Sequence, residues 1–417
     1  MEFLHWHDKY LETLSGVEKK KFVQELRIIK YLYVFGSKTN AEICRHLKIS
    51  APSSFSFLNE LINKNLIEKQ GRGESIGGRK PDLYGIKDDA LYVLAVEMGK
   101  YETKMSIFNG INTNITGIKS YHSMPLDENN TETIDKFYKY ATELIKSSGI
   151  DPAKLIALGI SIPGLVDSRK GVNYTYLNFG EKTLKDVLQK KFKLPVFIEN
   201  DAKAAALAEY RFGQAKGKKD VLSIFWDWGI GLGLIMDSKL YRGTSGFAGE
   251  FSHIPIVKDG ILCQCGKQGC LETIASGSAL SRLALEGIKS GKTSISNNSS
   301  EEDMDKIEAK FVLEAAHKGD QYAINILAEV GFNLGKGLAI LIQLLNPELI
   351  VLGGRIAEAG EYVTTPIQQS LNTFCMRQLK EPSSVVVSEM GQHVCLMGAV
   401  AIVMENIFEY YIKTVSK

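Results

Sequence analysis

Three cysteines fall within eight positions of this chain, ten residues after a histidine. The four residues are His253, Cys263, Cys265 and Cys270, in a chain of 417 residues with only six cysteines. Disulfide pairing would leave one of the three thiols over, and two cysteines separated by one residue can bridge to each other only with strain. Structural zinc prefers four thiolate or imidazole ligands in a tetrahedron, which leaves no position for a catalytic water. The spacing therefore predicts a structural zinc site, where Gly266 and Gly269 let the backbone wrap closely around the ion.

The composition is that of a globular protein with more than one domain. Hydrophobic residues make up 44% and charged residues 24% of the chain, and the formal net charge is only +2. These values exclude a disordered chain and a wholly basic surface, so any site for a polyanion must be local. Residues 1–9 carry charges and histidines where a secretory signal needs an apolar run, and no run of eighteen apolar residues follows. We expect a cytoplasmic protein with reduced thiols and no membrane partner.

The first ninety residues contain the pattern of a helix-turn-helix. An apolar-periodic helix over 23–35 stops at Gly36, Thr39 is placed to cap a short helix, and a second short helix begins near Pro52. Two short helices joined by a tight turn are typical of this motif. The N-terminal side of the second helix is expected to be exposed and to offer small hydrogen-bonding groups to phosphates or base edges. The residues expected to contact DNA from the two helices are Thr39, Ser50, Ser53, Ser54 and Ser56.

A basic hairpin follows the second helix. A strand over 66–70, a glycine-rich loop over 71–81 and a strand over 82–86 have the order of a wing. Lys69, Arg72, Arg79 and Lys80 against Glu74 give it a local excess of three positive charges, which suits phosphate contact or entry into a minor groove. Such a loop by itself is also compatible with a solvated hairpin. Together with the helices it predicts a winged helix-turn-helix in which Arg72, Arg79 and Lys80 contact DNA.

From residue 91 onward, strand-like apolar runs alternate with helical segments, as in an α/β protein. The segments 92–109 and 220–237 share one plan, an apolar strand, a turn and a second apolar strand, which suggests two lobes built on similar sheets. A buried strand that ends in a loop is expected over 155–167, a strand is expected to end at 199–201, and another is expected to enter a glycine turn over 349–354. A closing helix is expected over 394–411, and residues 291–303 are expected to form an exposed loop.

Several segments resemble the ROK family (repressors, open reading frames and sugar kinases), and within it the branch of winged-helix sugar-responsive repressors. The cysteine block with its upstream histidine is the most specific of them; the segments are residues 78–84, 161–167, 199–202, 249–253 and 263–272. The resemblance implies a two-lobed actin-like (ribonuclease H-like) ATPase fold after the winged helix, a sugar bound between the lobes, and a homodimer or dimer of dimers. The domains are then expected at 1–90, at 91–205 closed by the helix over 394–411, and at 206–393 with the zinc motif and the dimerisation surface.

The resemblance also implies which residues face the sugar. These are Asn200, Asp201, Glu250, His253 and Glu272. Carboxylate oxygens suit a sugar because they accept hydrogen bonds from vicinal hydroxyls, and a metal that fixes His253 and the 263–272 loop would orient these contacts. Without the resemblance, the Asn200-Asp201 pair would be interpreted as an ordinary helix cap.

The phosphate-binding turns argue against an enzyme. In the kinase branch the residue matching Asp201 acts as the base. However, the turn that is Asp-x-Gly-Gly-Thr in the kinases of the family is Glu97-Met-Gly-Lys-Tyr101 in this chain. The second phosphate turn, Gly-Thr-Gly in those kinases, is Asp227-Trp-Gly229 here. The larger side chains obstruct the close backbone approach that a phosphate cradle needs. We expect a repressor that binds palindromic operator DNA as a dimer and takes a sugar or sugar phosphate as effector. Two alternatives stay open, an ATP-dependent sugar kinase with a DNA-binding appendage and a repressor controlled chiefly by another protein.

Overall fold

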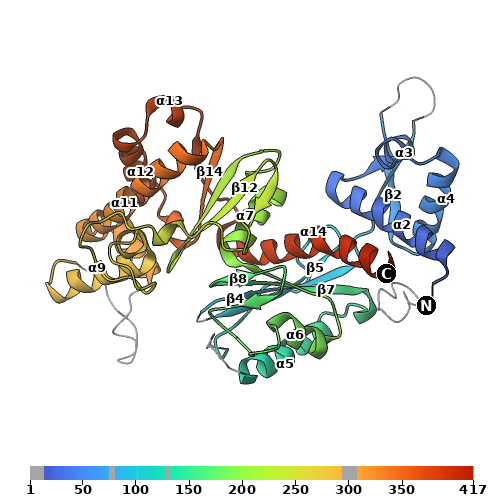
Figure 1. Cartoon of the computed structure of the whole chain (residues 1–417), viewed down its shortest axis with the longest axis horizontal. Coiled ribbons are helices and arrows are strands. Elements are labelled where there is room, and N and C mark those ends of the chain that lie inside the picture. The colour runs from blue at the N-terminus through green and yellow to red at the C-terminus, as the bar shows by residue number, and fades with distance from the viewer. Residues whose placement is uncertain are drawn as a thin grey trace. The chain divides into compact units, whose positions relative to one another are not determined.

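The computed structural model describes residues 14–74, 80–100, 102–124, 126, 131–293 and 308–416 (Figure 1). The chain divides into two compact units, residues 1–199 with 399–417 and residues 200–398. The second unit begins at Asn200, where a strand passes into a helix, whereas the sequence placed the boundary of the lobes after residue 205. Arg79, Tyr101 and most of the loop expected over 291–303 lie outside the described residues.

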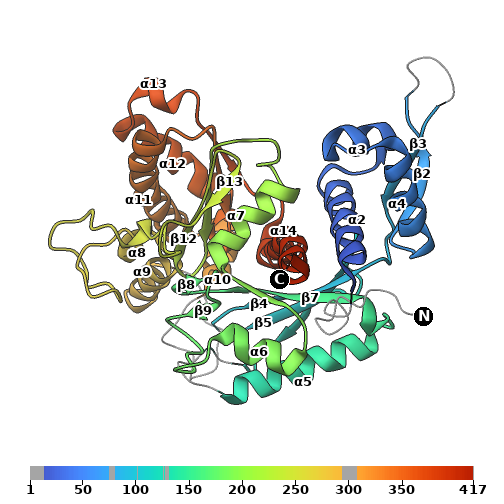
Figure 2. The same ribbon diagram turned by 45° about the vertical axis from the view of Figure 1, so that its right-hand side comes forward.

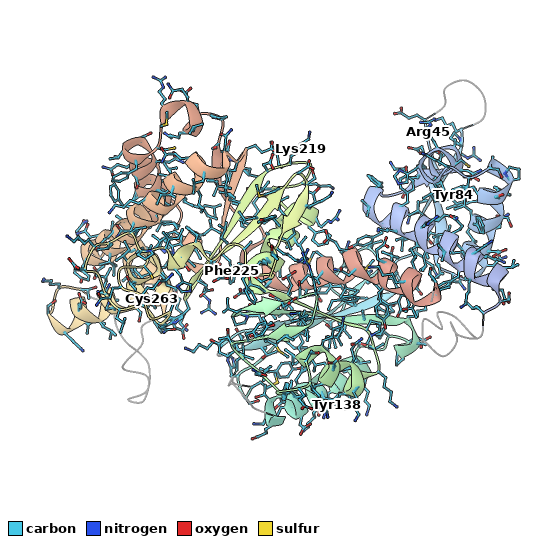
Figure 3. All side chains as sticks on the ribbon, in the orientation of Figure 1. Arg45, Tyr84, Tyr138, Lys219, Phe225 and Cys263 are labelled. Atoms are coloured by element: carbon cyan, nitrogen blue, oxygen red, sulfur yellow. The ribbon has the colours of Figure 1, made fainter. Side chains whose placement is uncertain are left out.

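The first unit begins with the winged helix-turn-helix that the sequence predicts. Its helices are α2 (Gly16–Phe35), α3 (Asn40–Leu47) and α4 (Ala51–Asn63), and its sheet has the order β1-β3-β2, from β1 (Lys38–Thr39), β2 (Ile67–Arg72) and β3 (Asp82–Ile86). Helix α2 starts seven residues earlier than expected because Ser15 and Glu18 form a capping box, and it ends at Gly36, which has φ 72°. Tyr84, labelled in Figure 3, is buried in this domain with Leu58 and Leu61.

The second part of this unit is a five-stranded sheet of order β10-β7-β4-β5-β6. The strands are β4 (Tyr92–Met98), β5 (Thr103–Asn109), β6 (Lys119–Tyr121), β7 (Leu155–Ile162) and β10 (Val196–Asn200), beside a small hairpin of β8 (Val166–Asp167) and β9 (Val172–Asn173). Helices α5 (Thr131–Ser147) and α6 (Leu184–Phe192) cover one face and α14 (Val394–Ser416) covers the other (Figure 2). Gly159 permits the close approach of α14, because a Cβ there would lie 2.2 Å from the Ala399 carbonyl oxygen.

The second unit repeats this sheet. Its order is β13-β12-β11-β14-β15, with β11 antiparallel to β12 and parallel to β14, as β4 is to β5 and β7. The strands are β11 (Val221–Trp226), β12 (Ile230–Met236), β13 (Lys239–Tyr241), β14 (Leu349–Gly353) and β15 (Ser384–Val387). The common order confirms the prediction of two lobes built on similar sheets.

Helices enclose both faces of the second sheet. Helix α7 (Asp201–Phe212) lies so close to β12 that a Cβ on Gly231 or Gly233 would meet Ala202 or Ala206. The main core on the opposite face includes residues of α8 (Glu272–Ala275), α9 (Gly277–Lys289), α10 (Ala309–His317), α11 (Gln321–Leu345) and α12 (Glu361–Phe374), with α13 (Arg377–Lys380) beyond them. Short 3-10 turns are η1 (Pro152–Lys154), η2 (Phe251–His253), η4 (Arg355–Ala359) and η5 (Gly391–His393).

Within the described part of the chain, two helices, α11 and α14, are long and apolar enough to cross a membrane. Their most apolar windows are 61% and 67% buried within the protein. Helix α11 packs closely on α12, since a Cβ on Gly331 would lie 2.8 Å from the Val363 carbonyl oxygen. The apolar surfaces of these helices therefore serve the core.

Candidate functional sites

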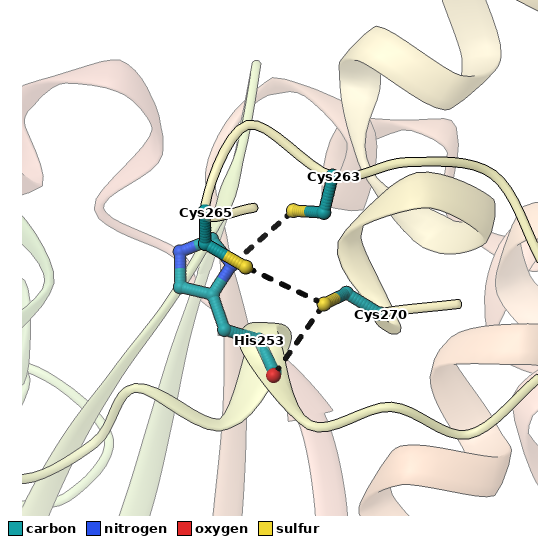
Figure 4. Close-up of side chains that lie close together, drawn as sticks. All are labelled: His253, Cys263, Cys265 and Cys270. Atoms are coloured by element: carbon teal, nitrogen blue, oxygen red, sulfur yellow. Dashed lines mark hydrogen bonds between the residues drawn. The ribbon is translucent and has the colours of Figure 1, made fainter. Parts of the chain in front are cut away.

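His253, Cys263, Cys265 and Cys270 come together in the second unit, with the four side chains pointing toward one point (Figure 4). Their ligand atoms all lie within 4.8 Å of one another. Cys263 Sγ is 3.6 Å from His253 Nδ1, and Cys265 Sγ is 3.6 Å from Cys270 Sγ. With metal–sulfur bonds of about 2.3 Å, two thiolates of a tetrahedral site lie about 3.8 Å apart. The cluster therefore has the donor set and the spacing to hold a metal ion of the zinc type.

The loop that carries the cysteines depends on two glycines. Gly266 and Gly269 have φ values of 86° and 74°, in the left-handed region that glycine adopts without strain. A Cβ on Gly269 would also lie 1.9 Å from the Val257 carbonyl oxygen. The prediction that these glycines allow a close wrap agrees with this geometry.

The three thiols of the cluster differ in how readily they ionise: a hydrogen bond from the Lys267 backbone lowers the pKa of Cys265, whereas the other two thiols have raised pKa values. Burial raises the pKa of Cys270 to about 12 and also raises the pKa of Cys263, and for Cys270 the neighbouring thiols raise it further. A thiol must lose its proton to bind a metal. A bound cation would favour the thiolate forms of Cys263 and Cys270, which burial disfavours.

The residues expected to face the sugar also gather on the second unit, around the start of α7. Burial raises the pKa of Asp201 to about 6, and the Glu250 and Asp227 carboxylates raise it as well, whereas the Ala202 N–H at 2.8 Å and Lys203 lower it. Desolvation likewise raises the pKa of Glu250, and the Glu272 carboxylate raises it further. Lys203 and His253 lower the pKa of Glu250. A group of carboxylates with raised pKa values is typical of a functional site.

Asn200 serves as the N-cap of α7. Its Oδ1 accepts a hydrogen bond from the Lys203 N–H at 3.2 Å, so the helix-cap interpretation of the sequence holds for this oxygen. Lys203 itself is only 2% exposed, and its charge lowers the pKa of both Asp201 and Glu250. Sequence reasoning missed Lys203 as part of this group. The available signal was a single charge within the alanine run of 202–206.

The Asp227-Trp-Gly229 turn lies against the same carboxylate group. The carbonyl oxygens of Asp227 and Trp228 accept hydrogen bonds from the first N–H groups of α9, those of Gly277 and Ser278, both at 2.9 Å. The Asp227 carboxylate is 3.5 Å from Arg355 Nε. A Cβ on Gly229 would lie 3.5 Å from Glu272 Oε2, so the turn is directly beside that carboxylate.

Thr39 and Ser50 cap the two helices of the helix-turn-helix. Thr39 Oγ1 accepts from the Glu42 N–H at 3.3 Å and donates to the Glu42 carboxylate at 2.8 Å. Ser50 Oγ accepts from the Ser53 N–H at 3.3 Å and lies 2.8 Å from Ser53 Oγ. The capping function expected for Thr39 is therefore confirmed, and these hydroxyls hold the helix starts in place.

The structure corrects two details of the expected DNA-binding face. Ser53 and Ser56 are exposed, but Ser54 is fully buried, because it lies one turn before Leu58 on the face that packs inward. The prediction that Ser54 is exposed is wrong. In the wing, Arg72 and Lys80 are exposed, whereas Lys69, counted toward its positive charge, is paired with Asp82 at 2.8 Å.

Sequence reasoning also missed two exposed side chains of α4. Phe55 is 48% exposed and Asn59 is exposed. They are four residues apart, which places them on one side of the helix. The sequence did contain a signal for Phe55, because it is an apolar residue at a position of the helix that does not face the core.

Comparison with known proteins shows which family and which characterised proteins this chain resembles. The profile of the ROK family matches residues 93–406. The chain is 30% identical over 399 residues to the xylose repressor of Bacillus spizizenii, which covers 94% of this chain and 97% of that protein. It is 28% identical over 393 residues to the DNA-binding transcriptional dual regulator NagC of Escherichia coli, covering 94% of each chain.

Solved structures share the fold. A ROK family transcriptional regulator described as a homolog of the E. coli MLC protein has a TM-score of 0.77 and 24% identity, over 96% of this chain and 100% of that chain. A ROK family glucokinase from Streptomyces griseus, solved with glucose and AMPPNP, has a TM-score of 0.65 and 32% identity, over 74% of this chain and 97% of that chain. The expected fold, a winged helix-turn-helix followed by a two-lobed actin-like portion, is confirmed. Since the family profile spans most of the sequence, the chain belongs to the ROK family.

Proposed function

We propose that this protein is a sugar-responsive transcriptional repressor, which binds operator DNA through its winged helix and a sugar or sugar derivative through the carboxylate group of its second unit. The observation that carries the proposal is the presence of both parts in a chain that aligns with a xylose repressor over nearly its whole length. The α4 helix and the wing strands present exposed hydroxyl and basic groups to DNA. The sugar would bias one of two arrangements of the protein and so change its affinity for DNA.

The sugar contacts that we propose are Asn200, Asp201, Glu250, His253 and Glu272. The carboxylates would accept hydrogen bonds from the sugar hydroxyls. His253 turns its Nδ1 toward the cysteine cluster, which leaves Nε2 to contact a hydroxyl. A structural zinc ion held by His253, Cys263, Cys265 and Cys270 would fix the orientation of that ring.

We also propose that the protein is not an enzyme. The Asp227-Trp-Gly229 turn supports this, because its carbonyl groups take the first N–H groups of α9, and Asp227 lies beside Arg355. A phosphate would find those N–H groups already engaged by the turn. The second candidate function is a sugar kinase, and it is favoured by the Asp201 carboxyl, whose pKa of about 6 suits a general base.

The assembly and location follow from this function. We propose a homodimer or dimer of dimers that presents two α4 helices to a palindromic operator, with half-sites one helical turn or a multiple apart. The second lobe would supply the dimerisation surface. A cytoplasmic protein with reduced thiols would keep the cysteine cluster available for a metal.

The test is an electrophoretic mobility shift of DNA from upstream of the protein's own gene, at fixed salt, titrated with sugars and sugar phosphates. Release or tightening by one sugar without ATP is the expected result. Sugar-dependent ADP formation without any specific shift would establish the kinase instead. A shift that no sugar changes, but that a protein captured from lysate abolishes, would indicate control by a partner.

A further inference from the structure

One side of α4 carries two exposed side chains, Phe55 and Asn59, whose chemical types can contact base edges in the major groove. Phe55 is 48% exposed and is four residues before Asn59, so the aromatic ring and the amide lie next to each other along one side of the helix. Leu58 and Leu61, which are fully buried, face the core of the domain. The neighbouring Ser53 and Ser56 are exposed, but a hydroxyl pairs with more than one base and discriminates little.

The same helix lacks the side chains that read guanine. Guanine is read by bidentate contacts from Arg or Lys, and α4, all of which the structure describes, has neither residue between Ala51 and Asn63. Lys64, just beyond its end, is held by the buried carboxylate of Glu25 at 2.7 Å. A guanine contact from this helix is therefore unsupported.

The acidic side chain of α4 is also engaged. Glu60 would be the group to accept a hydrogen bond from the cytosine amino group. Its Oε2 lies 2.6 Å from Lys21 Nζ of α2. This ion pair ties the carboxylate to the DNA-binding domain itself and leaves adenine and thymine as the bases that α4 is equipped to recognise.

We propose that α4 reads A·T base pairs, and that Phe55 and Asn59 determine this specificity. The Asn59 amide has the donor and acceptor that match N7 and the amino group of adenine, and the Phe55 ring offers apolar contact to the 5-methyl group of thymine. This inference rests on the proposed DNA-binding function. It assigns the readout to a ring and an amide rather than to the serines. Any G·C preference of the operator would then come from outside α4.

The first test is selection of binding sites by the full-length protein from a library of random duplex DNA. Wild-type protein is expected to enrich a site with A·T pairs at the centre of each half-site. Asn59→Ala should lose the preference for adenine, and Phe55→Ala the preference for thymine, at one or two adjacent positions each. Asn63→Ala is the matched control, because Asn63 is an exposed amide one turn further along α4, away from the end that enters the groove; it should select the wild-type site.

The second test changes the DNA and keeps the protein intact. Replacing the preferred thymine with deoxyuridine removes only the methyl group, and we expect a loss of affinity of about fivefold or more for wild type and little for Phe55→Ala. Replacing the preferred adenine with 7-deazaadenine removes N7. We expect this change to weaken binding by wild type and to have little effect on Asn59→Ala. Thermal melting of each variant is the control measurement for correct folding of the domain.

The outcomes distinguish the A·T readout by α4 from the DNA-binding function of the protein. Selection of G·C pairs at the central positions, or unchanged selection by both Phe55→Ala and Asn59→Ala, would overturn the A·T readout while leaving the repressor intact. A library from which wild-type protein enriches no sequence would overturn the DNA-binding function, and the readout with it.

Discussion

The Sγ atoms of Cys265 and Cys270 lie 3.6 Å apart. A disulfide needs about 2.05 Å, whereas two thiolates of a tetrahedral zinc site lie about 3.8 Å apart. The separation fits two thiols that are ligands of one ion, with Cys263 and His253 completing the set.

The metal site can be tested at Cys265, which is exposed, so that Cys265→Ser removes a ligand with little loss of packing. We expect protein purified under reducing conditions to hold about one zinc per chain and Cys265→Ser to lose most of it. Loss of a structural ion should lower the melting temperature by about 5 °C or more, because the binding free energy contributes to folding. Metal analysis and thermal melting measure both effects. Cys375→Ser, at a half-buried cysteine outside the cluster, is the control, and zinc retained by Cys265→Ser at the wild-type level would contradict the assignment.

The raised pKa of Asp201 predicts a pH-dependent change in stability. The value rises from 3.8 to about 6, so the folded protein holds this proton more tightly than the unfolded chain. The stabilising contribution is therefore complete below pH 3.8 and is lost as the pH rises through 6. Asp201→Asn should accordingly be more stable than wild type at pH 7.5 by roughly 3 kcal/mol, and the difference should disappear as the pH falls below 3.8.

Chemical denaturation of both proteins across this pH range measures the difference. Asp186→Asn is a control in which the change in stability should have the opposite sign. Hydrogen bonds from Thr183 lower the pKa of Asp186, so the charge of Asp186 is stabilising and its removal should destabilise the protein at neutral pH. The same Asp201→Asn protein should bind the sugar at least about tenfold more weakly, since a carboxylate acceptor is lost. A difference in stability that does not change with pH would contradict the pKa argument.

Ser54 and Ser56 should respond in opposite ways to replacement by alanine. The Ser54 hydroxyl is buried without a hydrogen-bond partner among the described residues. Removing it should leave DNA affinity unchanged and raise the free energy of unfolding by up to about 1 kcal/mol. Ser56→Ala, at an exposed position, should instead weaken DNA binding and leave stability unchanged. Thermal melting and mobility shifts on the two variants decide the matter, and reduced DNA affinity in a fully stable Ser54→Ala would restore the original expectation.

The wing should contribute affinity that depends on salt and not on sequence. Arg72→Ala and Lys80→Ala each remove one exposed positive charge, so each should lower the slope of log affinity against log salt by about one. The loss should be similar for operator and unrelated DNA. Lys289→Ala, an exposed lysine of the second unit, should leave the slope unchanged. A loss confined to the operator would show that the wing reads bases.

The sequence by itself determined the elements that local patterns specify. The strand predicted over 82–86 is observed as β3 (Asp82–Ile86), and the helix predicted to stop at Gly36 does so, because alternation, capping and glycine act within a few residues. The cysteine spacing identified a possible metal cluster before its geometry was known, since few other uses suit three thiols and a histidine so close together. The ROK resemblance rested on motifs of the same local kind.

Tertiary structure alone decided that Ser54 is fully buried and how the carboxylates interact. Ser54 and Ser56 look alike in the sequence, but packing of the domain buries one and exposes the other. The pKa of Asp201 depends on Asp227 and Glu250, which are 26 and 49 residues away along the chain. Burial and charge interaction depend on distances through space, and only the folded chain sets those distances.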